Sequence, residues 1–148
     1  MAHLQPTQSR SVPALVRMLA AAGGPRLRQA FADAGLGDIR PAQALALSAL
    51  VTGPRHASEI ATDLRVTRQA VAQAVTALEK GDYIARIPDP DDARAKLITL
   101  TDRGRDALRV MRTNALTVQE HWRQILGEDE LARLRSTLIR LIDASETM

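Results

Sequence analysis

The sequence predicts a mainly α-helical protein with one small β element of two to three strands. The chain has 148 residues, of which 45% are apolar, and it contains only one Phe, one Trp and one Tyr. A core with so few aromatic side chains is built from aliphatic packing, which suits helices better than sheets. Helical spacing of apolar residues dominates the chain and gives way to strand spacing only between residues 83 and 100. The length fits one domain with a helical extension.

Three helices are expected before residue 65, after a loose tail at residues 1–11. Helical spacing runs from Val12 to Leu36, but Gly23-Gly24-Pro25 interrupts it, so we expect a kink or two shorter helices there. Pro41 suits the first position of a second helix, which is expected to run to Gly53-Pro54. A third, short helix is expected over Ala57–Leu64.

The segment from Ala57 to Gly81 predicts a helix-turn-helix, because a tight turn at residues 65–67 is followed by a longer helix capped by Thr67. One face of that helix is apolar, and the opposite face carries Gln69, Gln73, Thr76 and Lys80, with Arg68 and Ala72 on its flank. The N-terminal part of a recognition helix enters the major groove, where Gln binds adenine edges and Arg binds guanine edges. From the helix alone, an amphipathic helix whose polar face meets only water is an equal alternative.

A hairpin after this helix favours the DNA-binding interpretation. Two strands are expected over Tyr83–Pro88 and Ala95–Leu100, around a polar loop at residues 89–94. In a winged helix such a hairpin lies beside the recognition helix, and an Arg at its tip can enter the narrow minor groove. Arg94 is that arginine, and Asp92 is expected either to pair with it or to hold the turn.

Two helices are expected at the C-terminal end, each with a seam of apolar residues. Thr101 caps the first, whose seam runs from Leu108 to Ile125 at alternating steps of three and four, and Gly127 ends it. The second begins with acidic residues that suit the positive end of a helix dipole, and its seam runs through leucines 131–141. These seams exceed what a domain of this size needs internally, so a partner chain is expected to bury them.

The run DPDDARAKLITLTDRG at residues 89–104 resembles the wing signature of the MarR family of multiple antibiotic resistance regulators. The upstream run VTRQAVAQAVTALEKGDYIAR at residues 66–86 resembles the same family's recognition helix and its entry into the wing. The terminal helices resemble the family only in pattern. The resemblance implies a homodimer, with a DNA-binding domain at residues 38–102 and a dimerisation region formed by residues 12–37 together with 103–148.

The resemblance also implies a function as a regulator, most often a repressor, that binds a pseudo-palindromic operator in double-stranded DNA. A small apolar or aromatic effector would release the DNA. The implied recognition contacts fall at Thr67, Arg68, Gln69, Ala72 and Gln73, with Arg94 in the minor groove and Asp92 as its partner in the motif. The exposed face of the helix adds Thr76 to these expected DNA-binding residues.

Two departures from the family's pattern affect the expected contacts. Ala93 stands where many members carry a further Arg, so one contact between wing and phosphate is expected to be missing. Arg65 stands at a turn position where Gly is common, and a left-handed conformation there costs a non-Gly residue about 1 kcal/mol. The absence of Cys excludes disulfides and the peroxide-sensing branch of the family.

Other functional classes find little support in the sequence. The three His residues are isolated from carboxylates at metal-ligand spacing, and neither a nucleophile elbow nor a phosphate-binding Gly-rich loop is present, so we expect no metal, no cofactor and no enzyme activity. No apolar run is long enough to span a bilayer, which predicts a cytoplasmic protein. The alternative is a helical dimer whose winged domain binds another protein without touching DNA.

Overall fold

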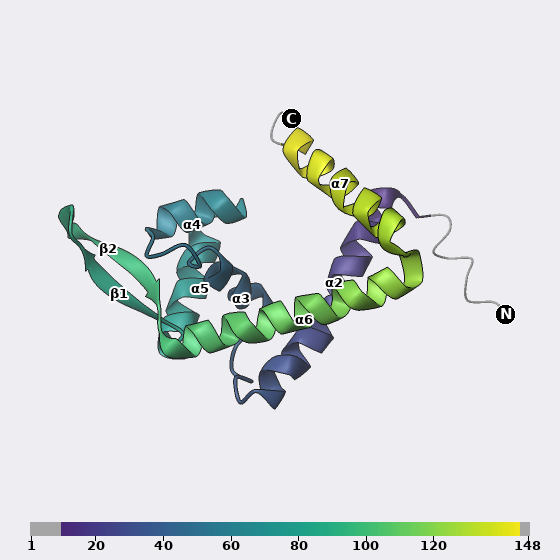
Figure 1. Ribbon diagram of the computed structural model, residues 1–148. Helices are drawn as coiled ribbons and strands as arrows, with labels where there is room; N and C mark the ends of the chain where they lie inside the picture. Colours follow the sequence, from purple (N-terminus) through teal and green to yellow (C-terminus); the bar gives the residue numbers. More distant parts are fainter. Residues whose placement is uncertain (1–9, 146–148) are drawn as a thin grey trace. The chain divides into compact units, whose positions relative to one another are not determined.

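The structure is a computed structural model that describes residues 10–145 of the chain. Most of the tail expected at residues 1–11 therefore lies outside the described residues. The described elements, in chain order, are α2 (Val12–Asp33), α3 (Pro41–Ser48), α4 (Ala57–Leu64), α5 (Arg68–Lys80), β1 (Ile84–Asp89), β2 (Asp92–Leu100), α6 (Asp102–Leu126) and α7 (Glu128–Ala144) (Figure 1). This order confirms the predicted, mainly helical fold with a small antiparallel sheet after the fourth of these helices.

The chain divides into two compact units, the first ending at Met111 and the second beginning at Arg112. The hydrophobic core lies in the first unit and takes residues from every element between α2 and the start of α6. Its largest fully buried side chains are Tyr83, Phe31, Leu47, Ile60, Leu78, Ile84, Ile98, Val71 and Val75. The three buried residues of α5 lie on one face of that helix, so its opposite face is left to solvent.

The first helix runs without interruption through the Gly-Gly-Pro segment at residues 23–25. α2 is one continuous helix of 22 residues with Pro25 inside it, so the expectation of two shorter helices was wrong. Pro25 removes one hydrogen-bond donor and places its ring against the preceding turn. The helix nevertheless continues through this position.

α3 is shorter than the sequence suggested, because it ends at Ser48 and not near Gly53. The chain continues in tighter turns, in which Leu50 donates to the carbonyl of Leu47 and Gly53 donates to that of Leu50. Arg55 then forms an isolated antiparallel bridge with Ile98 of β2. This bridge is the minimal third strand of the wing, which agrees with the prediction of two to three strands.

The hairpin of β1 and β2 is longer than predicted. The strands pair in antiparallel register from Ile84 opposite Leu100 to Pro88 opposite Lys96, and Asp89 lies opposite Asp92 after an irregularity. The polar loop expected at residues 89–94 was therefore too long, since only Pro90 and Asp91 lie between the strands. Asp92 and Arg94 belong to β2. The hairpin follows α5 directly and projects from that part of the unit (Figure 1).

The second unit is helical and exposes several large apolar side chains. α6 ends at Leu126 and Gly127 separates it from α7, as predicted. Among the described residues α7 buries no side chain. Ile125, Leu141 and Ile142 are each more than half exposed, at 66%, 55% and 54%.

Candidate nucleic-acid interface

Local hydrogen bonds fix both ends of α5. The side chain of Thr67 accepts a hydrogen bond from the backbone N–H of Ala70 at 3.1 Å, which satisfies a free donor of the first turn. At the other end, Gly81 donates to the carbonyl of Ala77, and Tyr83 donates to the carbonyl of Leu78. The predicted bounds of this helix, from Thr67 as the cap to Gly81, are confirmed.

The turn between α4 and α5 is formed by a residue in a left-handed conformation. Arg65 has φ 54° and ψ 44°, the conformation for which the sequence predicted a cost. The backbone N–H of Val66 donates to the carbonyl of Ala61 at 3.1 Å, which closes α4 in the manner usually provided by a glycine. The turn keeps its geometry although a non-Gly residue occupies it.

The outer face of α5 is polar and exposed. Val71, Val75 and Leu78 anchor the inner face in the core. The predicted contact residues on this helix and its cap are all exposed: Thr67, Arg68, Gln69, Ala72, Gln73 and Thr76. The structure thus brings these six together on one element and leaves their side chains accessible to a large partner.

Two of these six side chains also serve the helix itself. Thr67 is the N-cap, and the hydroxyl of Thr76 donates to the carbonyl of Ala72 at 2.9 Å. For Arg68, Gln69 and Gln73, the described residues contain no hydrogen-bond or ion-pair partner. Their donors and acceptors are therefore free to meet another molecule.

At the tip of the wing, Asp92 holds the backbone of Arg94. The carboxylate Oδ1 of Asp92 accepts a hydrogen bond from the backbone N–H of Arg94 at 3.0 Å. Of the two roles expected for Asp92, the structure therefore favours holding the turn over pairing with the guanidinium. Both residues are exposed. The guanidinium of Arg94 has no partner among residues 10–145.

One ion pair and one contact between a histidine and a carboxylate tie the wing to the helix-turn-helix. Nε of Arg86 on β1 lies 3.0 Å from a carboxylate oxygen of Glu79 on α5. Nε2 of His56, which precedes α4, lies 2.9 Å from Oδ2 of Asp89 at the end of β1. The hairpin is thus attached to both helices of the motif.

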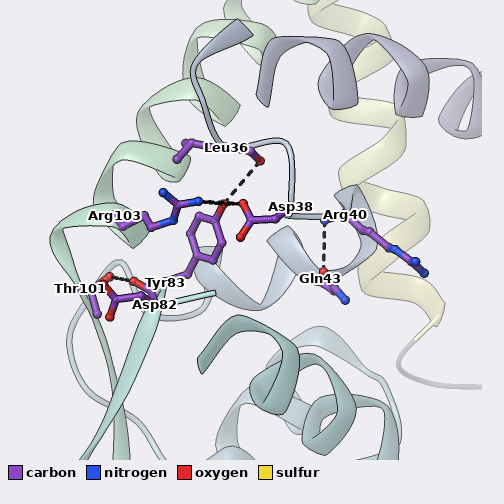
Figure 2. Close-up of polar contacts among 8 residues, drawn as sticks. All are labelled: Leu36, Asp38, Arg40, Gln43, Asp82, Tyr83, Thr101 and Arg103. Carbon is purple, nitrogen blue, oxygen red and sulfur yellow. Dashed lines mark hydrogen bonds and ion pairs between the residues drawn. The ribbon is translucent and has the colours of Figure 1, made fainter. Parts of the chain in front are cut away.

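A polar cluster that the sequence did not predict joins the base of the wing to α6 and to the loop after α2 (Figure 2). The hydroxyl of Tyr83 donates to Oδ1 of Asp38, and Nη2 of Arg103 donates to the same oxygen at 2.8 Å. The guanidinium of Arg103 also lies over the Tyr83 ring, 4.8 Å from its centre. Next to it, Thr101 accepts from the backbone N–H of Gly104 and donates to the carbonyl of Asp82.

The electrostatics of this cluster follow from burial and hydrogen bonding. Burial of the ring, reinforced by the hydrogen bond to Asp38, raises the pKa of Tyr83 to about 12. The hydrogen bond from Tyr83 holds the pKa of Asp38 below its usual value, with a smaller contribution from Arg103. Tyr83 is therefore a neutral donor and Asp38 an ionised acceptor over the whole physiological range.

Only weak signals in the sequence point to this cluster. Asp38, Tyr83 and Arg103 are separated by 45 and 20 positions, so their meeting depends on the tertiary fold. The one usable signal was that the single Tyr of the chain follows a Gly-Asp turn immediately before the wing.

Other kinds of site find no support within the described residues. Across residues 10–145, the His, Asp and Glu side chains form no group of three that could hold a metal ion. Within the same range, no helix is both long and apolar enough to cross a membrane.

An exposed recognition helix beside a hairpin with an arginine near its tip defines a winged helix-turn-helix protein. A family model described as the MarR family matches residues 37–95, which contain this helix and most of the wing. Over these residues the chain is similar to the MarR family, in agreement with the resemblance found in the sequence. The solved relatives that are 25–27% identical are described as transcriptional regulators and none as an enzyme, in agreement with the sequence interpretation.

Three known proteins illustrate the relationship. The repressor CouR, solved in complex with a 23-mer DNA duplex, is 26% identical, with a TM-score of 0.75 over 91% of this chain and 94% of that chain. The regulator SlyA is 23% identical, with a TM-score of 0.79 over 92% and 94% of the two chains, which shows the shared fold. The transcriptional activatory protein BadR of Rhodopseudomonas palustris is 26% identical over 90 residues. That match covers 61% of this chain and only half the length of BadR.

Proposed function

We propose that this protein is a sequence-specific regulator that binds a pseudo-palindromic operator in double-stranded DNA as a homodimer and represses transcription. One observation carries this function: the exposed face of α5 presents Arg68, Gln69 and Gln73, which have no side-chain partner among residues 10–145. The hairpin beside it presents Arg94. A structural relative of 26% identity is a DNA-bound repressor, which supports the same function.

Each proposed contact follows from the chemistry of its side chain. Gln69 and Gln73 suit the donor and acceptor pair on adenine, and Arg68 suits guanine or a phosphate. Ala72 lets the helix approach closely and offers a methyl group to thymine. Thr67 and Thr76 add hydroxyl groups on short side chains at the edges of the contact. Arg94 supplies a positive charge to the minor groove, and Asp92 keeps its backbone in place.

Exposed apolar surface supports the homodimer. On α2, Val12 and Leu19 are exposed by 66% and 52%, and on α7 Leu141 and Ile142 are similarly exposed. Large apolar side chains exposed on a helix are candidates for an interface, because large apolar patches are rarely left to solvent on a monomer. We therefore keep residues 12–37 together with 103–148 as the proposed dimerisation region and residues 38–102 as the proposed DNA-binding domain.

The sign of regulation differs between the relatives, since CouR is a repressor and BadR is described as an activatory protein. CouR is similar over nearly the whole chain, whereas BadR is similar over half of its own length. We therefore favour repression.

Release of DNA by a small apolar or aromatic anion completes the proposed function, on the basis of the family resemblance. Phe31 and Tyr83 lie in the core, so ring stacking from these two residues is not available to a ligand. Linkage requires DNA to weaken effector binding by the same factor by which the effector weakens DNA binding, typically about 5–150-fold. Titration of the DNA complex with phenolic acids such as salicylate tests this element, and unchanged DNA affinity for every acid would reject it.

Selection of bound duplexes from a random pool tests the function as a whole. The proposed function predicts enrichment of one inverted repeat, bound by two copies of the chain, that matches a site beside a gene in the source genome. A reporter under that site should be silenced by the protein. A pool without enrichment would favour the alternative, in which the winged domain binds another protein. Enrichment with an activated reporter would reverse only the sign of regulation.

A further inference from the structure

We propose that His56 is a positioning residue for the wing, which rests on the DNA-binding function proposed above. By binding Asp89, His56 holds the hairpin tip in the orientation that carries Arg94 to the minor groove. His56 is the N-cap residue of α4, so it belongs to the first helix of the motif and not to the wing.

The contact between the two residues is short and protected. Nε2 of His56 lies 2.9 Å from Oδ2 of Asp89, and the Asp89 side chain is only 9% exposed. A carboxylate in so buried a position needs a partner for its charge, because an unpaired buried polar group is costly. His56 is that partner on the side of the helix-turn-helix.

The same carboxylate organises the turn at the tip. Oδ1 of Asp89 accepts a hydrogen bond from the backbone N–H of Asp91 at 2.9 Å. Asp89 also lies opposite Asp92 in the hairpin, and Asp92 in turn accepts from the backbone N–H of Arg94 at 3.0 Å. A continuous chain of contacts therefore runs from His56 through the two aspartates to Arg94.

The strand ladder by itself leaves Arg94 less constrained. Between the pair Pro88–Lys96 and the pair Asp89–Asp92 the register shifts, so residues 93–95 of β2 have no counterpart on β1. Arg94 lies in this bulged segment, where side-chain hydrogen bonds replace the regular ladder. The two aspartates supply those bonds, and His56 fixes the first aspartate.

The residue before His56 binds the lower part of the same hairpin. The backbone of Arg55 donates to the carbonyl of Ile98 at 3.0 Å and accepts from its N–H at 2.8 Å. The backbone N–H of His56 donates to Oε2 of Glu59 at 2.7 Å, which fixes His56 on α4. Two consecutive residues thus attach the wing to α4, Arg55 at mid-strand and His56 at the tip.

A double-mutant cycle tests this role. The affinities of wild type, His56→Ala, Arg94→Ala and the double variant are measured on the selected operator at several salt concentrations. If His56 acts through Arg94, His56→Ala weakens binding and lowers the salt dependence in the wild-type background. In the Arg94→Ala background, His56→Ala should change the affinity by less than about twofold, which is the usual accuracy with which independent effects add.

The conservative variant separates positioning from general damage. His56→Gln offers an amide donor near the place of Nε2, so it should recover most of the affinity that His56→Ala loses. Asp89→Asn should behave like His56→Ala in the same cycle, which keeps the test valid if His56→Ala does not fold. Thermal unfolding of every variant supplies the control for folding.

The outcomes distinguish the two levels of inference. Fully additive losses for His56→Ala and Arg94→Ala would mean that His56 contacts DNA itself, and an unchanged affinity for His56→Ala would mean that it has no role. Either result overturns the positioning role while the DNA-binding function stands. If the wild type binds no duplex, the result contradicts the proposed DNA-binding function itself.

Discussion

The backbone of Gly104 in α6 lies against the carbonyl oxygen of Tyr83 at the base of the wing. A Cβ on Gly104 would come far closer than 3.0 Å to that oxygen, and backbone cannot move aside as a flexible side chain can. The same carbonyl accepts a hydrogen bond from the backbone N–H of Thr101. The start of α6 and the start of the wing are therefore in direct backbone contact.

This contact predicts that Gly104→Ala destabilises the fold strongly. Forcing a methyl group into a closed backbone contact costs about 1–3 kcal/mol or more of the free energy of unfolding. Gly37→Ala is the matched control, because its Cβ would meet Ala32 only at 3.6 Å, an ordinary contact. Urea denaturation should show a large loss for Gly104→Ala and almost none for Gly37→Ala. Equal effects of the two variants would contradict the close approach.

A second prediction concerns the ionisation of Tyr83, the only tyrosine of the chain. Its pKa is raised from 10.0 to about 12 in the folded protein. The stabilisation from this shift is complete below pH 10 and is lost as the pH rises from about 10 to about 12, since the unfolded chain ionises first. Near-ultraviolet absorbance of the tyrosinate measures the ionisation directly. Asp38→Asn should bring the pKa closer to 10, and a wild-type transition at pH 10 would contradict the cluster.

A third prediction concerns the dimer. Deletion of residues 128–148 should leave apolar surface without a partner and produce aggregation or an unfolded chain. A milder variant, Ile142→Glu, places a charge on a side chain that is 54% exposed in the single chain and should shift the oligomeric state towards monomer. Arg140→Ala on the same helix is the control. A stable, monodisperse monomer from the truncated chain would contradict an obligate dimer.

A fourth prediction concerns Arg94, which should contribute charge more than sequence readout. Arg94→Ala should weaken binding to operator and to scrambled duplexes alike and reduce the salt dependence by up to about one unit per subunit. Arg94→Lys should recover part of the electrostatic contribution but not the planar fit in the groove. Titrations at several salt concentrations measure both effects. An unchanged affinity for Arg94→Ala would show that the wing tip does not touch DNA.

Elements with strong local signals could be predicted from the sequence almost to the residue. Thr67 as a cap and Gly81 as a stop fix α5, and Thr101 and Gly127 bound α6 in the same way. These signals depend on the backbone of a few neighbouring residues, so no tertiary information is needed. The candidate contact face of α5 followed directly from the position of its buried residues.

The sequence was less informative wherever distant residues decide the structure. Pro25 suggested a break, but α2 continues through it. The polar residues 89–94 suggested a loop, where side-chain hydrogen bonds instead extend the strands. The contacts of Asp89 with His56 and of Asp38 with Tyr83 join segments 33 and 45 positions apart. Such contacts have no local spacing that a pattern can show.

The most direct test of sequence-specific DNA recognition is the affinity of Gln73→Ala for the selected operator and for a scrambled duplex of equal length. Gln73 is exposed on α5 and has no partner among residues 10–145, so its loss should leave the fold unchanged. If it reads a base edge, the variant should lose about 1–3 kcal/mol per half-site on the operator. It should lose much less on the scrambled duplex, because non-specific binding depends on phosphates. Equal losses on the two duplexes would contradict recognition by this face of the helix.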